Sequence, residues 1–375
     1  MANTKINQNK ILIILTGGTI CSTLNQNLKN KSNADSIKNY IVSDFKRSNS
    51  PYKNKVEFDY IKLTPDILSE NMTINAWNSL LNIFKNQVKW QDYKGIILLH
   101  GTDTLAYTSS LLSLVLSGAP IPIFLVSAHL PLLKTLTYDK NGKTITKQTK
   151  QTKSNGFINF KVSVELILNG ILPNVYVVYR NLTKTNKLGK TYIHLGSNLT
   201  QCKNYSNNFY SQSQVEIKDI KNAKNKGTLF ETKTFYLDKI KTLTTGVLLI
   251  NPYVGLDYSK YNLENVKAIV HNTYHSSTIC SEDNFSSESL SNYSILSLLK
   301  RCKNKISVYL APCDENSYAY ESTQKALKSG ALCIANTTLE MAFVKTLICY
   351  SINVSDKTKF LNSSVNYEFV YKNVE

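Results

Sequence analysis

Two short clusters of small and hydroxyl-bearing residues each follow an apolar run in the N-terminal half of the chain. The sequence TGGTI occupies Thr16–Ile20 directly after the run at 10–15, and GTDT occupies Gly101–Thr104 after the run at 95–100. A threonine hydroxyl becomes an effective nucleophile only when a base lies within hydrogen-bond reach. We therefore expect the two clusters to act together on one ligand and to face each other across a crevice.

Each cluster also has a purely structural interpretation. The glycines before Thr19 permit turn geometry closed to other residues, so TGGTI alone is compatible with a tight turn between a strand and a loop. GTDT alone is compatible with the N-terminal cap of a helix, where the helix dipole favours Asp103. Neither interpretation accounts for both threonine clusters at once, which favours a shared functional site.

Apolar runs that are typical of buried strands alternate with helix-like segments through this half of the chain. The expected strands are 10–15, 56–63, 95–100, 122–127 and 174–179, and the expected helices are 73–90, 105–116 and 156–170. This alternation predicts an α/β fold with a mostly parallel sheet that helices cover on both faces. Ligands of such sheets bind beyond the carboxyl ends of the strands, which is where both threonine clusters fall.

The C-terminal part of the chain has the pattern of a second, smaller α/β domain. Its expected strands are 246–251, 266–271, 305–310 and 331–336, with helices at 289–302, 321–327 and 339–351. We therefore expect a larger domain at 1–215 that carries the threonine clusters, a polar linker at 216–241 and the smaller domain at 242–375. Residues 134–153 contain six lysines and one acidic residue and are expected to form a projecting hairpin.

Charge and composition argue against several classes of function. The formal net charge is +18, but only Arg47, Arg180 and Arg301 are arginines, and the lysines are spread over the whole length. Proteins that read bases rely on paired arginine donors, so nucleic-acid binding is not expected. No run approaches the roughly 20 apolar residues of a membrane span, so no membrane association is expected. Seven cysteines without a CxxC pair favour a reducing cytoplasm, and neither a metal nor a cofactor is expected.

The two clusters resemble the signature stretches of the bacterial-type L-asparaginase family, in particular its cytoplasmic, type I-like members. TGGTI at Thr16–Ile20 and HGTDT at His100–Thr104 match those signatures residue for residue and in the same order. Further stretches resemble the same family: LSENMT at 68–73, VSAHLP at 126–131, SNGFIN at 154–159, NLTKT at 181–185 and TTLEMAFVKTLI at 337–348. The resemblance therefore extends over nearly the whole chain.

This resemblance implies hydrolysis of the side-chain amide of L-asparagine to L-aspartate and ammonia, without a cofactor. It implies that Thr19 is the nucleophile and that Thr102, Asp103 and Lys184 form a second catalytic group. A lysine acts as a base only when burial or nearby cations lower its pKa. The implied role of Lys184 therefore requires a buried or positively charged environment.

The same resemblance implies which residues bind the substrate, namely Gly18, Ser69, Glu70 and Ala128. Ser69 would bind the α-carboxylate, and the carboxylates of Glu70 and Asp103 would favour the α-ammonium end. Taken alone, Ser69 and Glu70 are also compatible with a helix N-terminal cap. Since the family completes its site across a subunit interface, a homodimer or homotetramer is expected.

Two departures from the family keep other functions open. The lid stretch after TGGTI has no tyrosine before Tyr40, and Asn272–Ser277 stands where the family often has a Gly-Val-Gly-Asn turn. One alternative is a related amidohydrolase that acts on glutamine, including the ammonia-supplying subunit of a tRNA-dependent amidotransferase. That subunit would be expected to carry a further N-terminal domain, whereas residues 1–9 alone precede the first expected strand. The other alternative is a non-catalytic amino-acid-binding protein with the same fold.

Overall fold

The structure is a computed structural model, which describes residues 9–24, 31–32, 34–138, 144–218, 236–282, 291–303, 305–313 and 320–370. The chain divides into two compact units, Met1–Asp238 and Lys239–Glu375. Most of the expected linker at 216–241 lies outside the described residues, so each unit is described by itself.

The first unit is built around a seven-stranded sheet with the order β13-β10-β9-β6-β5-β1-β4. These strands are β1 (Lys10–Leu15), β4 (Glu57–Lys62), β5 (Gly95–Leu99), β6 (Ile123–Val126), β9 (Val175–Leu182), β10 (Leu188–Leu195) and β13 (Val215–Glu216). From β4 to β9 all neighbours run parallel, whereas β10 and β13 pair in antiparallel fashion. The α/β fold class with a mostly parallel sheet is therefore confirmed.

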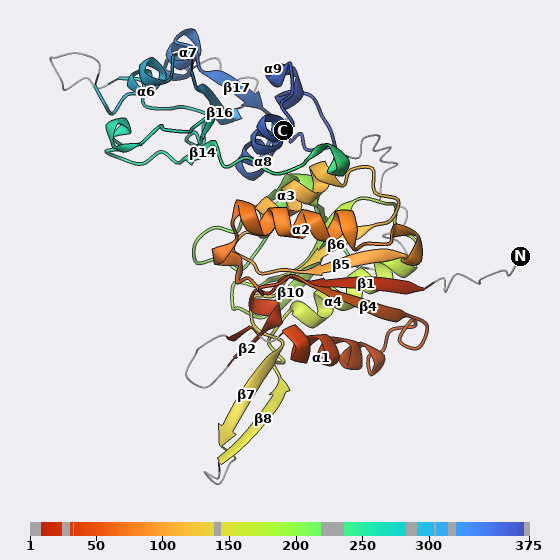
Figure 1. Ribbon diagram of the computed structural model, residues 1–375. Helices are drawn as coiled ribbons and strands as arrows, with labels where there is room; N and C mark the ends of the chain where they lie inside the picture. The colour runs from red at the N-terminus through yellow and green to blue at the C-terminus, as the bar shows by residue number, and fades with distance from the viewer. Residues whose placement is uncertain are drawn as a thin grey trace, which may run out of the picture. The chain divides into compact units, whose positions relative to one another are not determined.

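Helices cover both faces of this sheet, with α2 and α3 on one face and α1 and α4 on the other (Figure 1). Their bounds are α1 (Ala34–Lys46), α2 (Ile74–Asn86), α3 (Leu105–Val115) and α4 (Gly156–Leu168). Under α1 and α4, the strand residues Ile13, Leu99 and Val126 belong to one buried cluster with Phe45 of α1 and Phe160 of α4. Burying a side chain of this size contributes roughly 1.5–3 kcal/mol, so this layer holds the helices and strands in place.

The parallel register brings the ends of three strands into line, beside the middle of a fourth, β9. Leu15 of β1 pairs with Leu99 of β5, Leu99 pairs with Val126 of β6, and Val126 pairs with Val178 of β9. The residues that follow these positions therefore gather at a single carboxyl edge of the sheet.

A smaller four-stranded sheet with the order β3-β2-β7-β8 carries a hairpin that projects from the first unit (Figure 1). Its strands are β2 (Ser22–Leu24), β3 (Lys31–Ser32), β7 (Leu133–Tyr138) and β8 (Thr144–Lys150), and a separate pair is β11 (Leu199–Thr200) with β12 (Tyr210–Ser211). Because β7 and β8 pair in antiparallel fashion, the expected hairpin within 134–153 is confirmed. Its tip at 139–143 lies outside the described residues.

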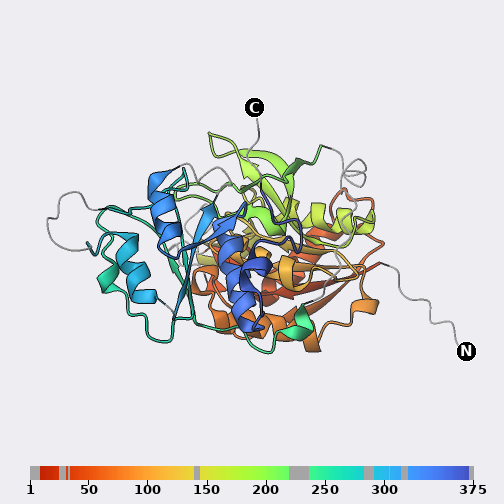
Figure 2. The same cartoon turned by 90° about the horizontal axis from the view of Figure 1, so that it is seen from above.

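The second unit contains a parallel four-stranded sheet with the order β14-β15-β16-β17. Its elements are β14 (Val247–Ile250), β15 (Ala268–His271), α6 (Ile295–Cys302), β16 (Ser307–Cys313), α7 (Glu321–Lys328), β17 (Leu332–Ala335), α8 (Leu339–Ser351) and α9 (Lys357–Leu361). Helices α6 and α7 lie on one side of this sheet and α8 lies on the other (Figure 2). Throughout the described parts of both units, no helix combines the length and the apolar character needed to cross a bilayer.

Candidate active site

The two threonine clusters meet because the strands before them are neighbours. Since β1 and β5 pair in parallel and end at Leu15 and Leu99, TGGTI and GTDT leave the sheet at adjacent positions. The backbone N–H and the Oγ1 of Thr16 both donate to the carbonyl of Leu99, at 3.2 and 2.8 Å. Both clusters thus lie at the carboxyl edge, as the sequence pattern predicts.

Glycine at position 18 is required by the close approach of the two turns. Gly18 has a φ of 75°, and a Cβ built on it would lie 2.4 Å from the backbone nitrogen of Gly101. Only glycine lets the backbones of the two turns come this close. Thr19, which begins the short helix η1 (Thr19–Cys21), and Thr102 are both half-buried. The two predicted catalytic threonines therefore follow directly on two turns that lie against each other.

A third segment, LSENMT at 68–73, is tied to the GTDT turn through Ser69. The Oγ of Ser69 donates to Oδ2 of Asp103 at 2.7 Å and accepts from the backbone N–H of Asp103 at 3.2 Å. The Oγ1 of Thr104 donates to the carbonyl of Ser69 at 3.0 Å. Ser69 is only 1% exposed, whereas Glu70 and Asp103 are exposed. A buried serine therefore holds a carboxylate that remains accessible to a ligand.

The neighbouring strand β6 adds Ala128 to the same edge. The backbone N–H of His100, directly after β5, donates to the carbonyl of Val126, the last residue of β6, at 2.9 Å. Ala128 is fully buried against the start of α4, where a Cβ built on Gly156 would lie 2.7 Å from the Cβ of Ala128. Ala128 thus lies one strand away from the GTDT turn, with its methyl group packed on α4.

His129 follows Ala128 and is held by Asn155, the residue before α4. Oδ1 of Asn155 accepts from the backbone N–H of His129 at 3.0 Å and lies 2.9 Å from its Nδ1, while Nδ2 of Asn155 donates to the carbonyl of Arg180 at 2.8 Å. Because an amide oxygen only accepts, Nδ1 of His129 carries the hydrogen and Nε2 keeps its lone pair. Partial burial lowers the pKa of His129 below 6.5, so the ring is neutral at pH 7.

His100 has a structural role in the GTDT turn. Its Nδ1 donates to the carbonyl of Gly101 at 2.7 Å, and complete burial lowers its pKa to about 4. The ring is therefore neutral and inaccessible, and it orders the backbone just before Thr102.

Lys184 lies in the turn between β9 and β10. The backbone N–H of Thr183 donates to the carbonyl of Lys187 at 2.8 Å, and Asn186 adopts a φ of 56°, which closes a tight hairpin. Lys184 is exposed, and within the described residues it makes no hydrogen bond or ion pair. The structure thus gathers the other predicted site residues at the sheet edge, and among the described residues none of them forms a hydrogen bond or ion pair with Lys184.

Two further residues at the GTDT turn carry no signal in the sequence, namely Gln201 and Cys202. Nε2 of Gln201 donates to the carbonyl of Thr102 at 2.7 Å, and its Oε1 accepts from the N–H of Ala106 at 3.1 Å. Burial and, to a smaller extent, the charge of Asp103 raise the pKa of the Cys202 thiol. Both residues lie in patternless polar sequence, so only the three-dimensional structure identifies them.

The lid stretch after TGGTI is described only in part, because residues 25–30 and 33 lie outside the described ranges. Tyr40 belongs to α1 and packs against the apolar core of the first unit, where burial raises its pKa to about 12. In the described part of the chain, its hydroxyl makes no hydrogen bond with Thr19. The stretch Asn272–Ser277 belongs to the second unit.

Residues 10–141 match a family model described as "Asparaginase, N-terminal". This range contains both threonine clusters and the segment LSENMT. The resemblance to the asparaginase family is therefore confirmed for the part of the chain that carries these motifs.

Curated proteins with similar sequences include asparaginases and one component of a tRNA-dependent amidotransferase. The L-asparaginase of Thermococcus kodakarensis is 34% identical over 125 residues, which is 33% of this chain and 35% of that protein. L-asparaginase 1 of Escherichia coli (strain K12) is 33% identical over 92 residues, which is 24% of this chain and 25% of that protein. A subunit of the glutamyl-tRNA(Gln) amidotransferase of Methanococcus maripaludis is 28% identical over 206 residues, which is 52% of this chain and 43% of that protein. The matched regions span less than half the length of each relative.

Solved structures match over almost the whole chain. The thermostable L-asparaginase from Thermococcus kodakarensis has a TM-score of 0.66 at 20% identity and is matched over 96% of this chain and 99% of its own. L-asparaginase I from Vibrio cholerae has a TM-score of 0.64 at 19% identity, with 97% and 99% coverage. At these identities the likeness concerns the fold, and it confirms the α/β fold class for both units.

Proposed function

We propose that this protein is an amidohydrolase that converts L-asparagine to L-aspartate and ammonia, with Thr19 as the nucleophile. The observation that carries the proposal is the contact between the two threonine turns, in which Gly18 lies against Gly101. That contact brings the Thr19 and Thr102 segments together at the edge where α/β proteins bind ligands. The sequence match of residues 10–141 to the asparaginase N-terminal family supports the same chemistry.

Attack on an amide requires a group that takes the proton of the nucleophile. We assign this role to Nε2 of His129, because Asn155 fixes the ring with that lone pair unprotonated and no described residue occupies it. Lys184 is exposed in the hairpin turn and therefore lacks the burial that its implied role calls for. His129 thus replaces Lys184 as the proposed proton acceptor.

The proposed reaction proceeds through an ester. Oγ1 of Thr19 attacks the amide carbon, its proton passes through Nε2 of His129 to the leaving nitrogen, and ammonia departs. Water then attacks the ester carbon and gives a proton to Nε2 of His129. Nε2 returns this proton to Oγ1 of Thr19 as aspartate leaves.

The other site residues are proposed to bind the α-ammonium group and the reacting amide of the substrate. The exposed carboxylate of Asp103 is proposed to bind the α-ammonium group, and the hydrogen bonds from Ser69 fix its orientation. Glu70 adds a second exposed carboxylate next to Ser69. Thr102 is proposed to contact the reacting amide, with its backbone held by Gln201.

The experiment that tests this function is ammonia release by the purified full chain from L-asparagine and, separately, from L-glutamine. We expect turnover of asparagine that disappears in Thr19→Ala and persists in Thr185→Val, a control at an exposed threonine in the β9–β10 turn. Absence of ammonia from both amides, with a folded protein, would contradict the proposal and favour a non-catalytic amino-acid-binding protein.

A glutamine-directed activity is the second candidate, because one relative of this chain belongs to the glutamyl-tRNA(Gln) amidotransferase of Methanococcus maripaludis. Faster ammonia release from L-glutamine than from L-asparagine would support it. We favour asparagine because residues 10–141 match the asparaginase N-terminal family model, and because the L-asparaginases of Thermococcus kodakarensis and Escherichia coli are 34% and 33% identical over their matched regions, compared with 28% for the Methanococcus maripaludis subunit.

We further propose that the enzyme works in the cytoplasm as a homodimer or homotetramer. Seven scattered cysteines fit a reducing compartment, and one solved structure with this fold is titled a probable cytoplasmic L-asparaginase, from Campylobacter jejuni. Sedimentation of the purified chain at several concentrations tests the oligomeric state, and a monomer at all of them would contradict it.

A further inference from the structure

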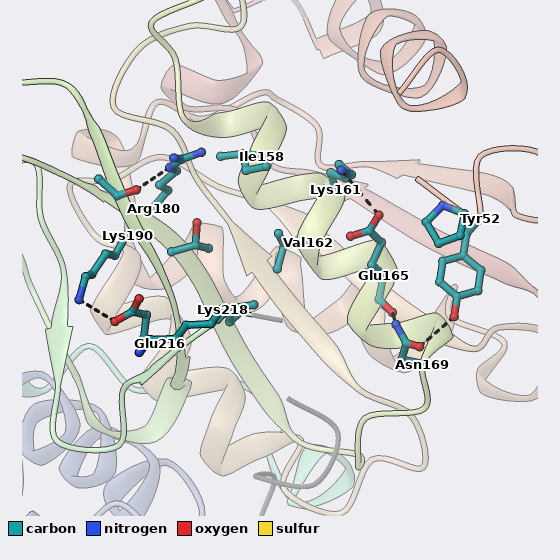
Figure 3. A pocket seen from close by; sticks show the side chains of 14 residues that line it. Tyr52, Ile158, Lys161, Val162, Glu165, Asn169, Arg180, Lys190, Glu216 and Lys218 are labelled. Atoms are coloured by element: carbon teal, nitrogen blue, oxygen red, sulfur yellow. Dashed lines mark hydrogen bonds and ion pairs between the residues drawn. The ribbon is translucent and has the colours of Figure 1, made fainter. Parts of the chain in front are cut away.

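A pocket of about 540 Å³ lies in the first unit, between α4 and the strands β9, β10 and β13 (Figure 3). Its volume falls within the range of roughly 300–1,000 Å³ that small-molecule sites occupy. None of the residues assigned to the amide reaction lines it. The pocket is therefore separate from the candidate active site, and an inference about it goes beyond the proposed function.

The charged side chains of this pocket leave an excess of positive charge. Nζ of Lys190 lies 2.8 Å from Oε2 of Glu216, and Nζ of Lys161 lies 3.8 Å from Oε1 of Glu165 (Figure 3). The hydrogen bond and charge of Lys190 hold the pKa of Glu216 below its ordinary value, and nearby Lys218 acts in the same direction. Both carboxylates of the lining therefore already have a lysine partner.

Among the described residues, Arg180 and Lys218 are the lining cations without a carboxylate partner, and Arg180 is the one whose side chain the protein holds in place. Its Nε donates to the carbonyl of Gly189 at 2.8 Å, its backbone N–H donates to Oδ1 of Asn159 at 2.8 Å, and its carbonyl accepts from Asn155. The bond from Nε holds the guanidinium group, which Figure 3 shows turned toward Ile158 of α4, and the other two contacts hold the backbone. Within the described residues, its two terminal nitrogens have no hydrogen-bond partner.

A guanidinium that is held in place and has two unpartnered terminal nitrogens is suited to a carboxylate or a phosphate, which it binds through two parallel hydrogen bonds. Beside it, Ile158 and Val162 of α4 and Ile217 after β13 supply an apolar lining. An arrangement with one anion-binding group next to apolar side chains is typical of sites for small organic acids.

We propose that this pocket binds a small organic acid, with the carboxylate paired to Arg180 and an apolar body packed over Val162 and Ile217. Lys218, which is exposed at the pocket margin, adds long-range attraction for the same anion. The amide reaction at the sheet edge does not require this ligand.

Calorimetric titration of the full chain with 4-phenylbutyrate tests the proposal, with 4-phenylbutan-1-ol as an uncharged probe of similar shape. We expect saturable binding of the acid at millimolar concentration or below, and at least about tenfold weaker binding of the alcohol, because a charge-assisted hydrogen bond contributes about 1.5–3 kcal/mol. Arg180→Gln should weaken binding of the acid by a similar factor. Lys187→Gln, which removes an exposed cation outside the pocket, should leave it unchanged.

Circular dichroism and thermal unfolding establish that each variant folds. If Arg180→Gln does not fold, Lys218→Gln takes its place, and weaker binding of the acid by that exposed variant supports the proposal. Equal affinity for the acid and the alcohol, unchanged affinity in the folded pocket variant, or no saturable binding of the acid would overturn it.

Discussion

The side chain of Ser69 forms two hydrogen bonds with Asp103, donating to Oδ2 at 2.7 Å and accepting from the backbone N–H at 3.2 Å. One buried hydroxyl thus fixes both the carboxylate and the backbone of a residue that lies 34 positions away in the sequence. The carboxylate itself stays exposed, so its orientation depends on this contact.

Ser69→Ala should therefore impair both stability and activity. The substitution leaves the backbone N–H of Asp103 without its acceptor, which we expect to cost about 1–3 kcal/mol of unfolding free energy. Ammonia release should fall at least about tenfold, since a misplaced catalytic carboxylate costs that much or more. Urea denaturation and the amide assay measure the two effects.

The matched control for this prediction is Ser48→Ala. The Oγ of Ser48 also donates one hydrogen bond, to the carbonyl of Phe45 at 2.7 Å, and accepts one, from the N–H of Ser50 at 3.2 Å, after the end of α1. Its loss should leave ammonia release unchanged. An equal loss of activity in both serine variants would mean that the Ser69 contact has no specific role.

Thr102→Val should abolish most turnover while the fold is retained. Valine has nearly the shape of threonine and lacks the hydroxyl, and the hydrogen bond from Gln201 reaches the backbone carbonyl, which the substitution does not change. We expect ammonia release to fall by about 10²-fold or more, as when a group that contacts the reacting amide is removed. An unfolding midpoint like that of the unmodified protein, combined with full activity, would rule out a catalytic role for Thr102.

The proton acceptor can be identified from a comparison of His129→Gln with Lys184→Met. Loss of a general base costs about 10²–10⁴-fold, so His129→Gln should lose nearly all ammonia release. Lys184→Met should retain it, because Lys184 is exposed in the hairpin turn. The opposite result, with activity lost only in Lys184→Met, would restore the role that the sequence resemblance implies for Lys184.

The pH dependence of kcat/KM provides an independent test of His129. Partial burial lowers the pKa of His129 from 6.5, and the neutral ring is the form that accepts a proton. At pH 6.5 most molecules therefore still have a neutral His129 ring, and kcat/KM should decline only at more acidic pH. An acid limb centred above pH 6.5 would show that another group is the base.

The sequence predicts the central elements of the fold well because their physical signal is strong. β1, β5 and β6 are almost completely buried on both faces and therefore read as continuous apolar runs. Helix α2 begins at Ile74, as its cap residue Thr73 indicates, and it ends at Asn86 rather than at residue 90. The end is harder to predict because the apolar period continues through Val88 and Trp90 beyond the last helical turn.

The sequence of strand β10 has a much weaker apolar pattern, and this affects the prediction for Lys184. It is mostly half-exposed, and Gly189 and Lys190 interrupt its apolar pattern, so 188–195 is not recognised as a strand from the sequence. Without that strand, the hairpin that leaves Lys184 in an exposed turn cannot be foreseen. The motif resemblance locates NLTKT in the sequence, but the exposure of Lys184 depends on which strand pairs with β9.

Contacts between residues distant in sequence form the other part of the site that the sequence does not reveal. Gln201 reaches the carbonyl of Thr102, and Asn155 orients His129, through hydrogen bonds that leave no periodic pattern. The glycines of TGGTI are predictable because a turn demands them, whereas an amide side chain is compatible with almost any exposed position.

The second unit contains a fully buried ion pair whose removal should be strongly destabilising. Nζ of Lys345 in α8 lies 2.6 Å from Oε1 of Glu368, and both side chains are 0% exposed. Lys345→Met leaves the Glu368 carboxylate buried without its countercharge, which we expect to cost about 3–5 kcal/mol of unfolding free energy. Urea denaturation of the full chain at pH 7, followed by the far-ultraviolet circular dichroism signal, measures this loss.

The double variant Lys345→Met with Glu368→Gln separates the charge from the hydrogen bonds. Glu368 also accepts from the backbone N–H groups of Val365 and Asn366, and a glutamine oxygen can still accept both. The double variant should therefore recover much of the stability that Lys345→Met loses. Although burial raises the pKa of Glu368, Lys345 and the backbone N–H groups of Asn366 and Glu368 bring it below 4.5. The contribution of the Glu368 carboxylate to the free energy of unfolding is therefore complete above pH 4.5, and it is lost as the pH falls through the lowered pKa of Glu368. Equal stability of the single and double variants at neutral pH would show that the buried charge itself carries no penalty.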